Sequence, residues 1–309
     1  MGLAPGWGLC CVALSSCADS VHSDAMTAFV FSRVRLSGAF YGCFFAVLCA
    51  CFFLGCRSRS VVDRAALDDL RSVSSLAAAD VDEIFVGLPV GAASLAGRSF
   101  SDPLVVRSLL LRIRSAVPAL TSAKSTFFAL ADARGVFIRN DLELDSMAGQ
   151  SLFGAFPAFG RLSAGVVTTA TGLLPGVPST DRDWVAATPI GGDAGVSGIL
   201  ITGWSYRYFA RHLQESLRRQ LQRDLAERGE SRKMPIVYVS VFDRSGVYSA
   251  PTTPDADEKA LARLPLPTSA APGPISGLVT IDSREFGYAA AVVSRLGPDV
   301  GIAVLRSEI

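Results

Sequence analysis

The longest apolar stretch of the chain runs from Leu36 to Gly55 and reads LSGAFYGCFFAVLCACFFLG. Its twenty residues carry no charge, and a helix of that length spans the ~30 Å hydrocarbon core of a bilayer. Arginines flank both ends, so the loop-charge rule gives no orientation; they are Arg33, Arg35, Arg57, Arg59 and Arg64. Because the N-terminal flank is short and irregular, we expect a small cytoplasmic head, one membrane segment and a large extracytoplasmic body.

The end of this stretch, Phe53-Leu54-Gly55-Cys56, resembles the lipobox of bacterial lipoproteins, in which the cysteine is lipidated. Leu48-Cys49-Ala50-Cys51 is a rival match. An uncleaved signal anchor is the alternative, because twenty apolar residues exceed the roughly 7 to 15 of a cleaved signal sequence. A basic segment follows Met26, so translation starts at Met1 or at Met26. Both readings of the stretch tether the body to a membrane.

Helical spacing begins directly after the membrane segment. From Val61 to Phe85 apolar residues recur every three or four positions, which predicts an amphipathic helix, and Gly87-Leu88-Pro89 is expected to break it. A second helix is expected from Asp102 to Pro118, where Asp102 can cap the first turn and Pro103 suits its first position.

The most regular helical pattern lies in the middle of the body, from Tyr206 to Lys233, with Gly229 near its end. Eight Lys and Arg residues stand there beside four Asp and Glu residues. A basic patch for anionic lipid is one reading. A solvated helix face with pairs such as Arg211 and Glu215 is the other, and it is favoured.

Strand patterns occur twice in the same order on either side of that helix. Phe127 to Ile138 and Ile236 to Tyr248 each predict a hairpin around an Asp-x-x-Gly turn, at Asp132 and at Asp243. Each hairpin is followed by a loop, which is a Gly- and Pro-rich connection over 149–179 in the first half and a Pro- and Ala-rich insertion over 251–274 in the second. Closing strands come next; these are Trp184–Pro189 and Gly198–Trp204 in the first half, and Gly277–Ile281, Gly287–Val293 and Gly301–Leu305 in the second. The repetition predicts two lobes of one kind.

The amino-acid composition argues against several classes of function. The 309 residues carry 29 basic and 28 acidic side chains, so no global field gathers nucleic acid. All seven cysteines lie at or before Cys56, and the only histidines are His22 and His212. The body therefore forms neither a disulfide nor a thiolate metal site, and His-based triads and zinc sites are disfavoured.

The hairpins, the WVAATPI and GVSGILITGW strands and the helix from Tyr206 resemble double Cache domains, which are extracytoplasmic sensor modules. The resemblance covers residues 57–309. It implies an α+β fold in which one N-terminal membrane segment precedes two PAS-like antiparallel-sheet lobes along a long helix. The expected divisions are 1–35, a tail or signal n-region; 36–56, the anchor or lipoprotein signal; 57–205, a helix plus the membrane-distal lobe; 206–233, the connecting helix; and 234–309, the second lobe.

The resemblance also implies a ligand in lobe one, between the sheet and the loop after the hairpin. Candidate contacts are Arg139, Asn140, Arg182, Asp183 and Trp184. An arginine pair can clamp a carboxylate and a tryptophan can cover an apolar or amine group. A surface loop with Trp184 in the core is the alternative. Alternation along the strand places Arg182 and Trp184 on one face and Asp183 on the other.

These features indicate a non-enzymatic ligand-sensing or solute-binding protein at a bacterial cell membrane, with a periplasmic body and no cofactor. The alternative is a structural or assembly lipoprotein whose lobes bind a protein partner. An enzyme ranks third, since Asp132 and Asp243 suit turns better than acid–base catalysis. Candidate partners are a small molecule carrying a carboxylate, the membrane, a signalling protein and a second copy of the chain; nucleic acid is not expected.

Overall fold

The computed structural model describes the backbone of residues 38–192, 195–230, 234–270 and 273–308, and the side chains from residue 61 onward. Contacts divide the chain into residues 1–52 and a compact unit of residues 53–309, which holds both sheets. Among the residues searched, no helix is long and apolar enough to cross a membrane. The predicted segment Leu36–Gly55, Cys56 and the alternative start at Met26 lie outside the residues whose side chains are described.

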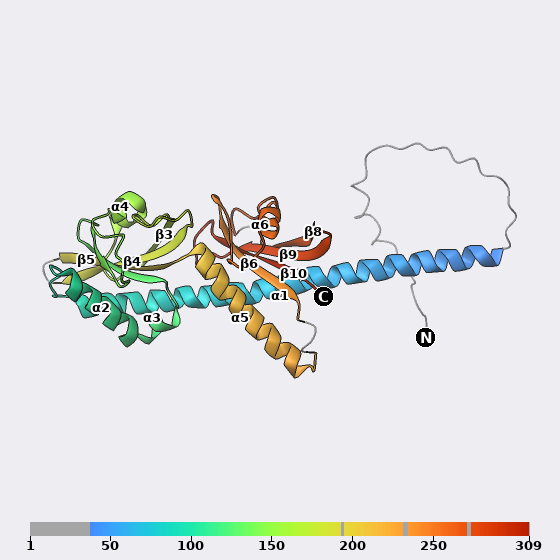
Figure 1. Ribbon diagram of the computed structural model, residues 1–309, viewed down its shortest axis with the longest axis horizontal. Helices are drawn as coiled ribbons and strands as arrows, with labels where there is room; N and C mark the ends of the chain where they lie inside the picture. The colour runs from blue at the N-terminus through green and yellow to red at the C-terminus, as the bar shows by residue number, and fades with distance from the viewer. Residues whose placement is uncertain (1–37, 193–194, 231–233, 271–272, 309) are drawn as a thin grey trace, which may run out of the picture. The chain divides into compact units, whose positions relative to one another are not determined.

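The predicted α+β class with two antiparallel-sheet lobes is confirmed (Figure 1). The first sheet has the order β2-β1-β5-β4-β3, and the second repeats it as β7-β6-β10-β9-β8. The strands of lobe one are β1 (Phe127–Asp132), β2 (Phe137–Asn140), β3 (Thr168–Gly172), β4 (Asp183–Gly192) and β5 (Gly195–Ser205). The strands of lobe two are β6 (Ile236–Asp243), β7 (Gly246–Ser249), β8 (Ile275–Ile281), β9 (Arg284–Val292) and β10 (Gly301–Ser307).

Helix α1 extends from Gly38 to Leu95 and serves both lobes. Its buried residues belong to one apolar cluster together with residues of β1, β4 and β5 in lobe one and of β6, β9 and β10 in lobe two. Both sheets thus pack against α1. Burial of such apolar faces is the main source of stability in a fold of this kind.

The expectation that Gly87-Leu88-Pro89 ends the first helix is wrong, because α1 continues through Pro89 to Leu95. Leu88 and Leu95 are each at most 2% exposed, and Gly87 lets α1 approach Leu120, whose Cγ lies 2.7 Å from where a Cβ would stand. Tertiary packing here outweighs the helix-breaking tendency of proline.

The remaining helices cover the sheets at several points. They are α2 (Pro103–Ala116), α3 (Pro118–Ser122), α4 (Leu152–Ala155), the 3-10 helix η1 (Pro157–Arg161), α5 (Tyr206–Glu227) and α6 (Asp255–Leu261). The predicted cap of α2 is confirmed, since the Asp102 carboxylate accepts a hydrogen bond from Leu104 N at 2.8 Å. The expected helix from Tyr206 is α5, and Arg211 pairs with Glu215 at 2.7 Å as predicted.

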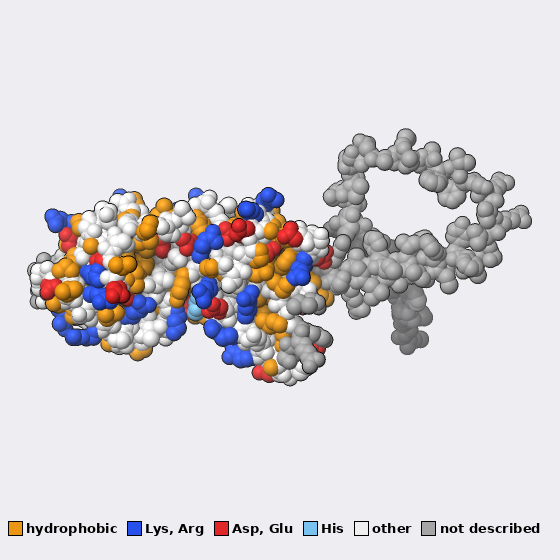
Figure 2. All heavy atoms as spheres, viewed as in Figure 1, with side chains coloured by type: hydrophobic (Ala, Val, Ile, Leu, Met, Phe, Trp, Pro, Cys, Tyr) orange, Lys and Arg blue, Asp and Glu red, His pale blue; other side chains and the backbone are white. Residues whose placement is uncertain are grey.

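Charged side chains of both signs are interspersed over the face shown in Figure 2. Helix α5 carries arginines but no lysine, and its Arg211 pairs with the acidic neighbour Glu215. This mixture matches the near balance of 29 basic and 28 acidic residues in the sequence.

Candidate functional site

Arg182, directly before β4, connects the two lobes. Its Nε lies 2.8 Å from Oδ2 of Asp243, at the end of β6, and its Nη2 donates to Thr171 Oγ1 at 3.4 Å. The Arg182 side chain is 26% exposed and that of Asp243 is 4% exposed. Although the charged atoms are close, the buried Nε–H makes no hydrogen bond. The contact is therefore a close ion pair that links the two lobes.

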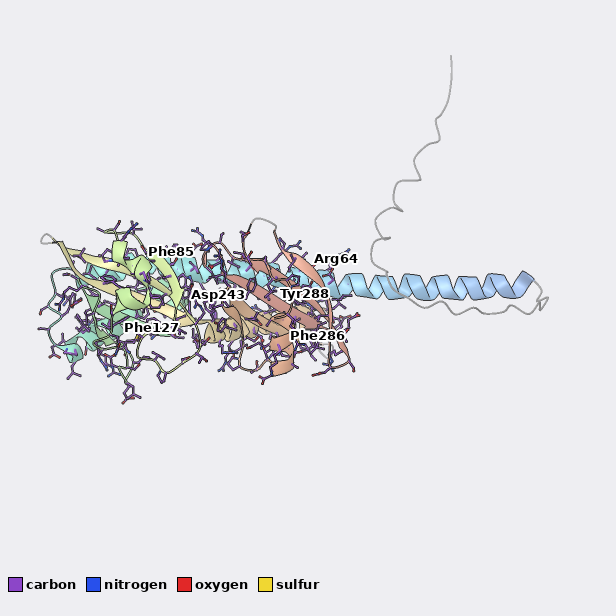
Figure 3. The ribbon with its side chains drawn as sticks, turned by 90° about the horizontal axis from the view of Figure 1, so that it is seen from above. Arg64, Phe85, Phe127, Asp243, Phe286 and Tyr288 are labelled. Atoms are coloured by element: carbon purple, nitrogen blue, oxygen red, sulfur yellow. The ribbon has the colours of Figure 1, made fainter. Side chains whose placement is uncertain are left out.

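Asp243 also accepts hydrogen bonds from its own turn and from the first residue of α5. Its Oδ1 accepts a hydrogen bond from Ser245 N at 2.7 Å, and its Oδ2 accepts one from the Tyr206 hydroxyl at 3.1 Å. Burial raises the pKa of Tyr206, and the neighbouring Asp243 carboxylate raises it further. Tyr206 therefore stays a neutral donor to Asp243, and Figure 3 shows Asp243 at the side of lobe two nearest lobe one.

Trp184 faces the helix side of the first sheet. It is 1% exposed, belongs to the cluster that contains α1, and lies 4.8 Å from Trp204 between ring centroids. Its Nε1 donates to Leu296 O of lobe two at 2.6 Å. Arg182 and Trp184 thus both contact lobe two, and neither reaches the predicted space beneath the loop that follows the lobe-one hairpin.

Asp183 lies on the opposite face of β4, as alternation predicts. The next residue on that face, Val185, belongs to a second apolar cluster with Leu174, and Leu174 N donates to Asp183 Oδ2 at 3.4 Å. Burial raises the pKa of Asp183 from 3.8 to about 7, and the Asp181 carboxylate adds to the rise. Asp183 is thus a buried acid without a strong partner.

Arg139 and Asn140 lie in β2, at the other edge of the sheet from β3. Two strands separate β2 from β4, which at ~4.8 Å per step places β2 about 14 Å from β4. Arg139 pairs with Asp145 at 3.1 Å, and the Asn140 amide oxygen accepts from Leu142 N at 2.9 Å. The structure therefore brings Arg182, Asp183 and Trp184 together and leaves Arg139 and Asn140 apart.

The face of the first sheet that the loop covers is filled by side chains. Four phenylalanines, a methionine and a leucine pack there in a separate cluster, each at most 9% exposed; they are Phe127, Phe137, Phe156, Phe159, Met147 and Leu174. Phe156 and Phe159 come from the loop itself, with ring centroids 5.6 Å apart. A ligand on this face would have to displace them.

An open cleft lies instead where β3 approaches lobe two. It has a volume of about 300 Å³ and runs between the α4–η1 segment, β3 and the β9–β10 loop. Its lining includes Phe156, Thr169, Thr171, Leu296 and Asp299. Thr171 is the lining residue that contacts Arg182, so the guanidinium adjoins the wall of the cleft.

The sequence did not identify the partners of Arg182. Asp243 was expected only as a turn residue, and nothing in the pattern marked its second carboxylate oxygen as a contact to lobe one. Strand β3, which carries Thr171, fell within a Gly- and Pro-rich segment expected to be a connection. Among the described residues, no three His, Cys, Asp or Glu side chains are grouped to hold a metal ion.

No protein-family model and no curated protein matches the chain. Solved structures similar to it include the ligand-binding domain of the Pseudomonas fluorescens chemoreceptor CtaA in complex with L-leucine, at 16% identity and a TM-score of 0.46 over 81% of this chain and 97% of that one. The Pseudomonas aeruginosa chemoreceptor PctB domain in complex with L-Arg is similar at 15% identity and a TM-score of 0.44, over 78% and 87%.

An extracellular ligand-binding receptor from Desulfohalobium retbaense is similar at 12% identity and a TM-score of 0.46; the match covers 78% of this chain and 40% of that receptor. By their names, these structures are ligand-binding domains of chemoreceptors and an extracellular ligand-binding receptor. With identities below 25% and TM-scores below 0.5, they do not establish what this chain binds.

Proposed function

We propose that residues 57–309 form a membrane-tethered, extracytoplasmic ligand-sensing module without enzymatic activity. The observation that carries the proposal is Arg182, whose side chain is 26% exposed and whose guanidinium contacts Thr171 in the wall of a cleft of about 300 Å³. A partly exposed guanidinium next to an open cleft suits a small carboxylate, which can bind arginine through two parallel hydrogen bonds.

Within this proposal, Arg182 binds the carboxylate and Thr171 lies beside it at the cleft wall. Trp184 fixes the start of β4, directly after Arg182, through its bond to Leu296. Asp183 lies behind the strand as a buried acid. Arg139 and Asn140 make contacts at the β2 edge of the sheet, away from Arg182. They would contact a ligand only if it bound at a second site near β2.

The test is a thermal melt of the full chain in detergent with succinate or acetate at constant ionic strength. A ligand at a hundredfold excess over its dissociation constant adds about 2.7 kcal/mol to the free energy of unfolding, so the melting temperature should rise. Arg182→Lys keeps the charge facing Asp243 but loses the bidentate fork, and it should lose most of the shift while melting near wild type without ligand.

Arg134→Ala is the matched control, because Arg134 pairs only within its own turn, with Asp132 at 3.2 Å. It should keep the full shift. If a wide set of carboxylates leaves the wild-type melting temperature unchanged, or if Arg182→Lys keeps the shift, the proposal is wrong.

The second candidate function is an assembly protein whose lobes bind a protein partner. The observation that favours it is the filled face of the first sheet, where Phe156 and Phe159 occupy the space expected for a ligand. An assembly protein should co-purify with one stoichiometric envelope partner and show no response to any small carboxylate.

A further inference from the structure

The two Asp-x-x-Gly turns occupy equivalent places in the two lobes, yet their aspartates differ in what the second carboxylate oxygen contacts. In lobe one, Asp132 satisfies both oxygens locally: Oδ1 accepts from Arg134 N at 2.9 Å and from Val136 N at 2.8 Å, and Oδ2 pairs with Arg134. In lobe two, Asp243 caps its turn with Oδ1 but directs Oδ2 to Arg182 of lobe one and to the Tyr206 hydroxyl at the start of α5. The turn itself does not need that contact.

The Arg182–Asp243 pair also falls short of the best geometry for its groups. The atoms approach within 2.8 Å, but the Nε–H is buried and makes no hydrogen bond. An arginine and a carboxylate that meet fork to fork form two such bonds. A freely oriented carboxylate that meets the guanidinium fork to fork can therefore satisfy Arg182 better than the close Nε contact of Asp243 does.

We propose that Asp243 is an internal competitor for the carboxylate ligand of Arg182, and that the ligand acts by exchange. When the ligand carboxylate binds Arg182, Asp243 loses its partner in lobe one but keeps its bonds from Tyr206 and Ser245, so the turn between β6 and β7 is held by one contact fewer. This inference rests on the proposed function, since it assigns the regulation of the same site. Binding in lobe one would thereby alter lobe two through one side chain.

Other contacts define how far the release extends. Arg207, in the first turn of α5, holds Glu258 of α6 through two bonds of 2.8 Å and donates to Ser249 O at the end of β7. These bonds do not involve Arg182, so the far end of β7 stays attached to α5. Exchange therefore loosens the turn at 243–246 and leaves the rest of the second sheet in place.

The experiment compares wild type, Asp243→Asn and Asp132→Asn as full chains, with succinate and acetate as probes and calorimetry as the readout. Asparagine keeps the turn-capping oxygen but removes the competing charge. The apparent affinity for a ligand falls in proportion to the fraction of molecules that are free to bind it, and in wild type the Arg182–Asp243 pair reduces that fraction. Asp243→Asn should therefore bind the carboxylate about tenfold more tightly, which is within the usual range of coupled sites. Asp132→Asn should leave the affinity unchanged.

Hydrogen exchange on the same proteins gives a second readout that does not need a ligand. The turn at 243–246 should exchange faster in Asp243→Asn than in wild type, and carboxylate should produce the same increase in wild type. Unchanged exchange in the core strands β9 and β10 would show that the variant is folded.

The outcomes separate the two proposals. Tighter carboxylate binding by Asp243→Asn than by wild type supports the exchange proposal. The same conclusion holds if Asp243→Asn binds the carboxylate measurably and wild type does not. If wild type binds a carboxylate and Asp243→Asn binds it equally well, exchange is wrong while the ligand-sensing function stands. If neither protein binds any carboxylate, both proposals fall.

Discussion

At the scale of single residues, Asp183 combines an unusual pKa with a position beside Arg182. Its carboxyl group is 6% exposed and has only a long hydrogen bond from Leu174 N, at 3.4 Å. Burial raises its pKa to about 7, so the folded chain keeps Asp183 protonated at pH values where the unfolded chain has released the proton. Folding and protonation at this residue are therefore linked.

The sign of the pH effect follows from that linkage. A raised pKa gives a stabilising contribution that is complete below the ordinary pKa of 3.8 and is lost as the pH rises through about 7. We therefore predict that Asp183→Asn, which is neutral at every pH, loses less stability than wild type between pH 4 and pH 7. Chemical denaturation at several pH values measures this difference.

A constant difference between the two proteins across that pH range would show that Asp183 titrates normally. Val185→Ala is a suitable control, because Val185 lies on the same face of β4 and removes apolar packing without a titrating group. It should lower stability by a similar amount at every pH.

At the scale of elements, the sequence predicted the two hairpins, the closing strands and α5 well. Their signals are local: strand alternation, Gly135 at the turn position that takes a φ of 77°, and helical spacing from Tyr206. The repeated strand order then followed from the repeated pattern. Local chemistry and tertiary structure agree in these segments.

The elements that the sequence missed depend on tertiary contacts. Strand β3 reads TTATG within a segment rich in Gly and Pro and is a strand because it pairs with β4 over five positions. Helix α6 lies in a segment expected to be a Pro- and Ala-rich loop. The contact between Arg182 and Asp243 of lobe two could not be predicted for the same reason. Strand alternation indicates on which face of the sheet a side chain lies, but it does not indicate which residues of the other lobe lie against that face.

Gly87 tests why α1 continues through the proline. An added Cβ would stand 2.7 Å from Leu120 Cγ and 3.1 Å from Leu120 N. Alanine is favoured over glycine in a helix by about 1 kcal/mol, but here we predict that Gly87→Ala lowers the free energy of unfolding, by about 1 to 3 kcal/mol for an overpacked site. Equilibrium unfolding in urea measures the change.

Gly97, outside the helix, has open space around its Cβ position and a φ of 75°, so Gly97→Asn is a control that should change stability little. Increased stability in Gly87→Ala would mean that α1 and α3 pack less closely than the structure indicates.

At the scale of the whole molecule, one apolar cluster joins both lobes to α1. Polar contacts between the lobes include the Arg182–Asp243 pair and the bond from Trp184 to Leu296, and the cleft of about 300 Å³ is lined by Leu296 and by Thr171, which contacts Arg182. Under the proposed function, the shared core keeps the lobes together while a ligand changes these polar contacts.

The proposed membrane tether makes a separate prediction in cells. If Cys56 is lipidated, Cys56→Ala should accumulate as an unprocessed precursor of higher mass, because cleavage before the cysteine depends on that residue. Mass spectrometry of the membrane fraction measures this, and Cys43→Ala is the matched control, because Cys43 lies in the same apolar stretch but outside both lipobox-like matches. An uncleaved anchor would instead show no mass change beyond the substitution.

The central claim is that Arg182 exchanges Asp243 for a ligand carboxylate. The most direct measurement is an experimental structure of the full chain bound to the carboxylate that gives the largest thermal shift. We predict that both carboxylate oxygens of the ligand accept hydrogen bonds from Arg182, and that Asp243 Oδ2 moves out of contact with Arg182 Nε from its present 2.8 Å. A ligand bound elsewhere, or bound with the Arg182–Asp243 pair intact, would contradict the claim.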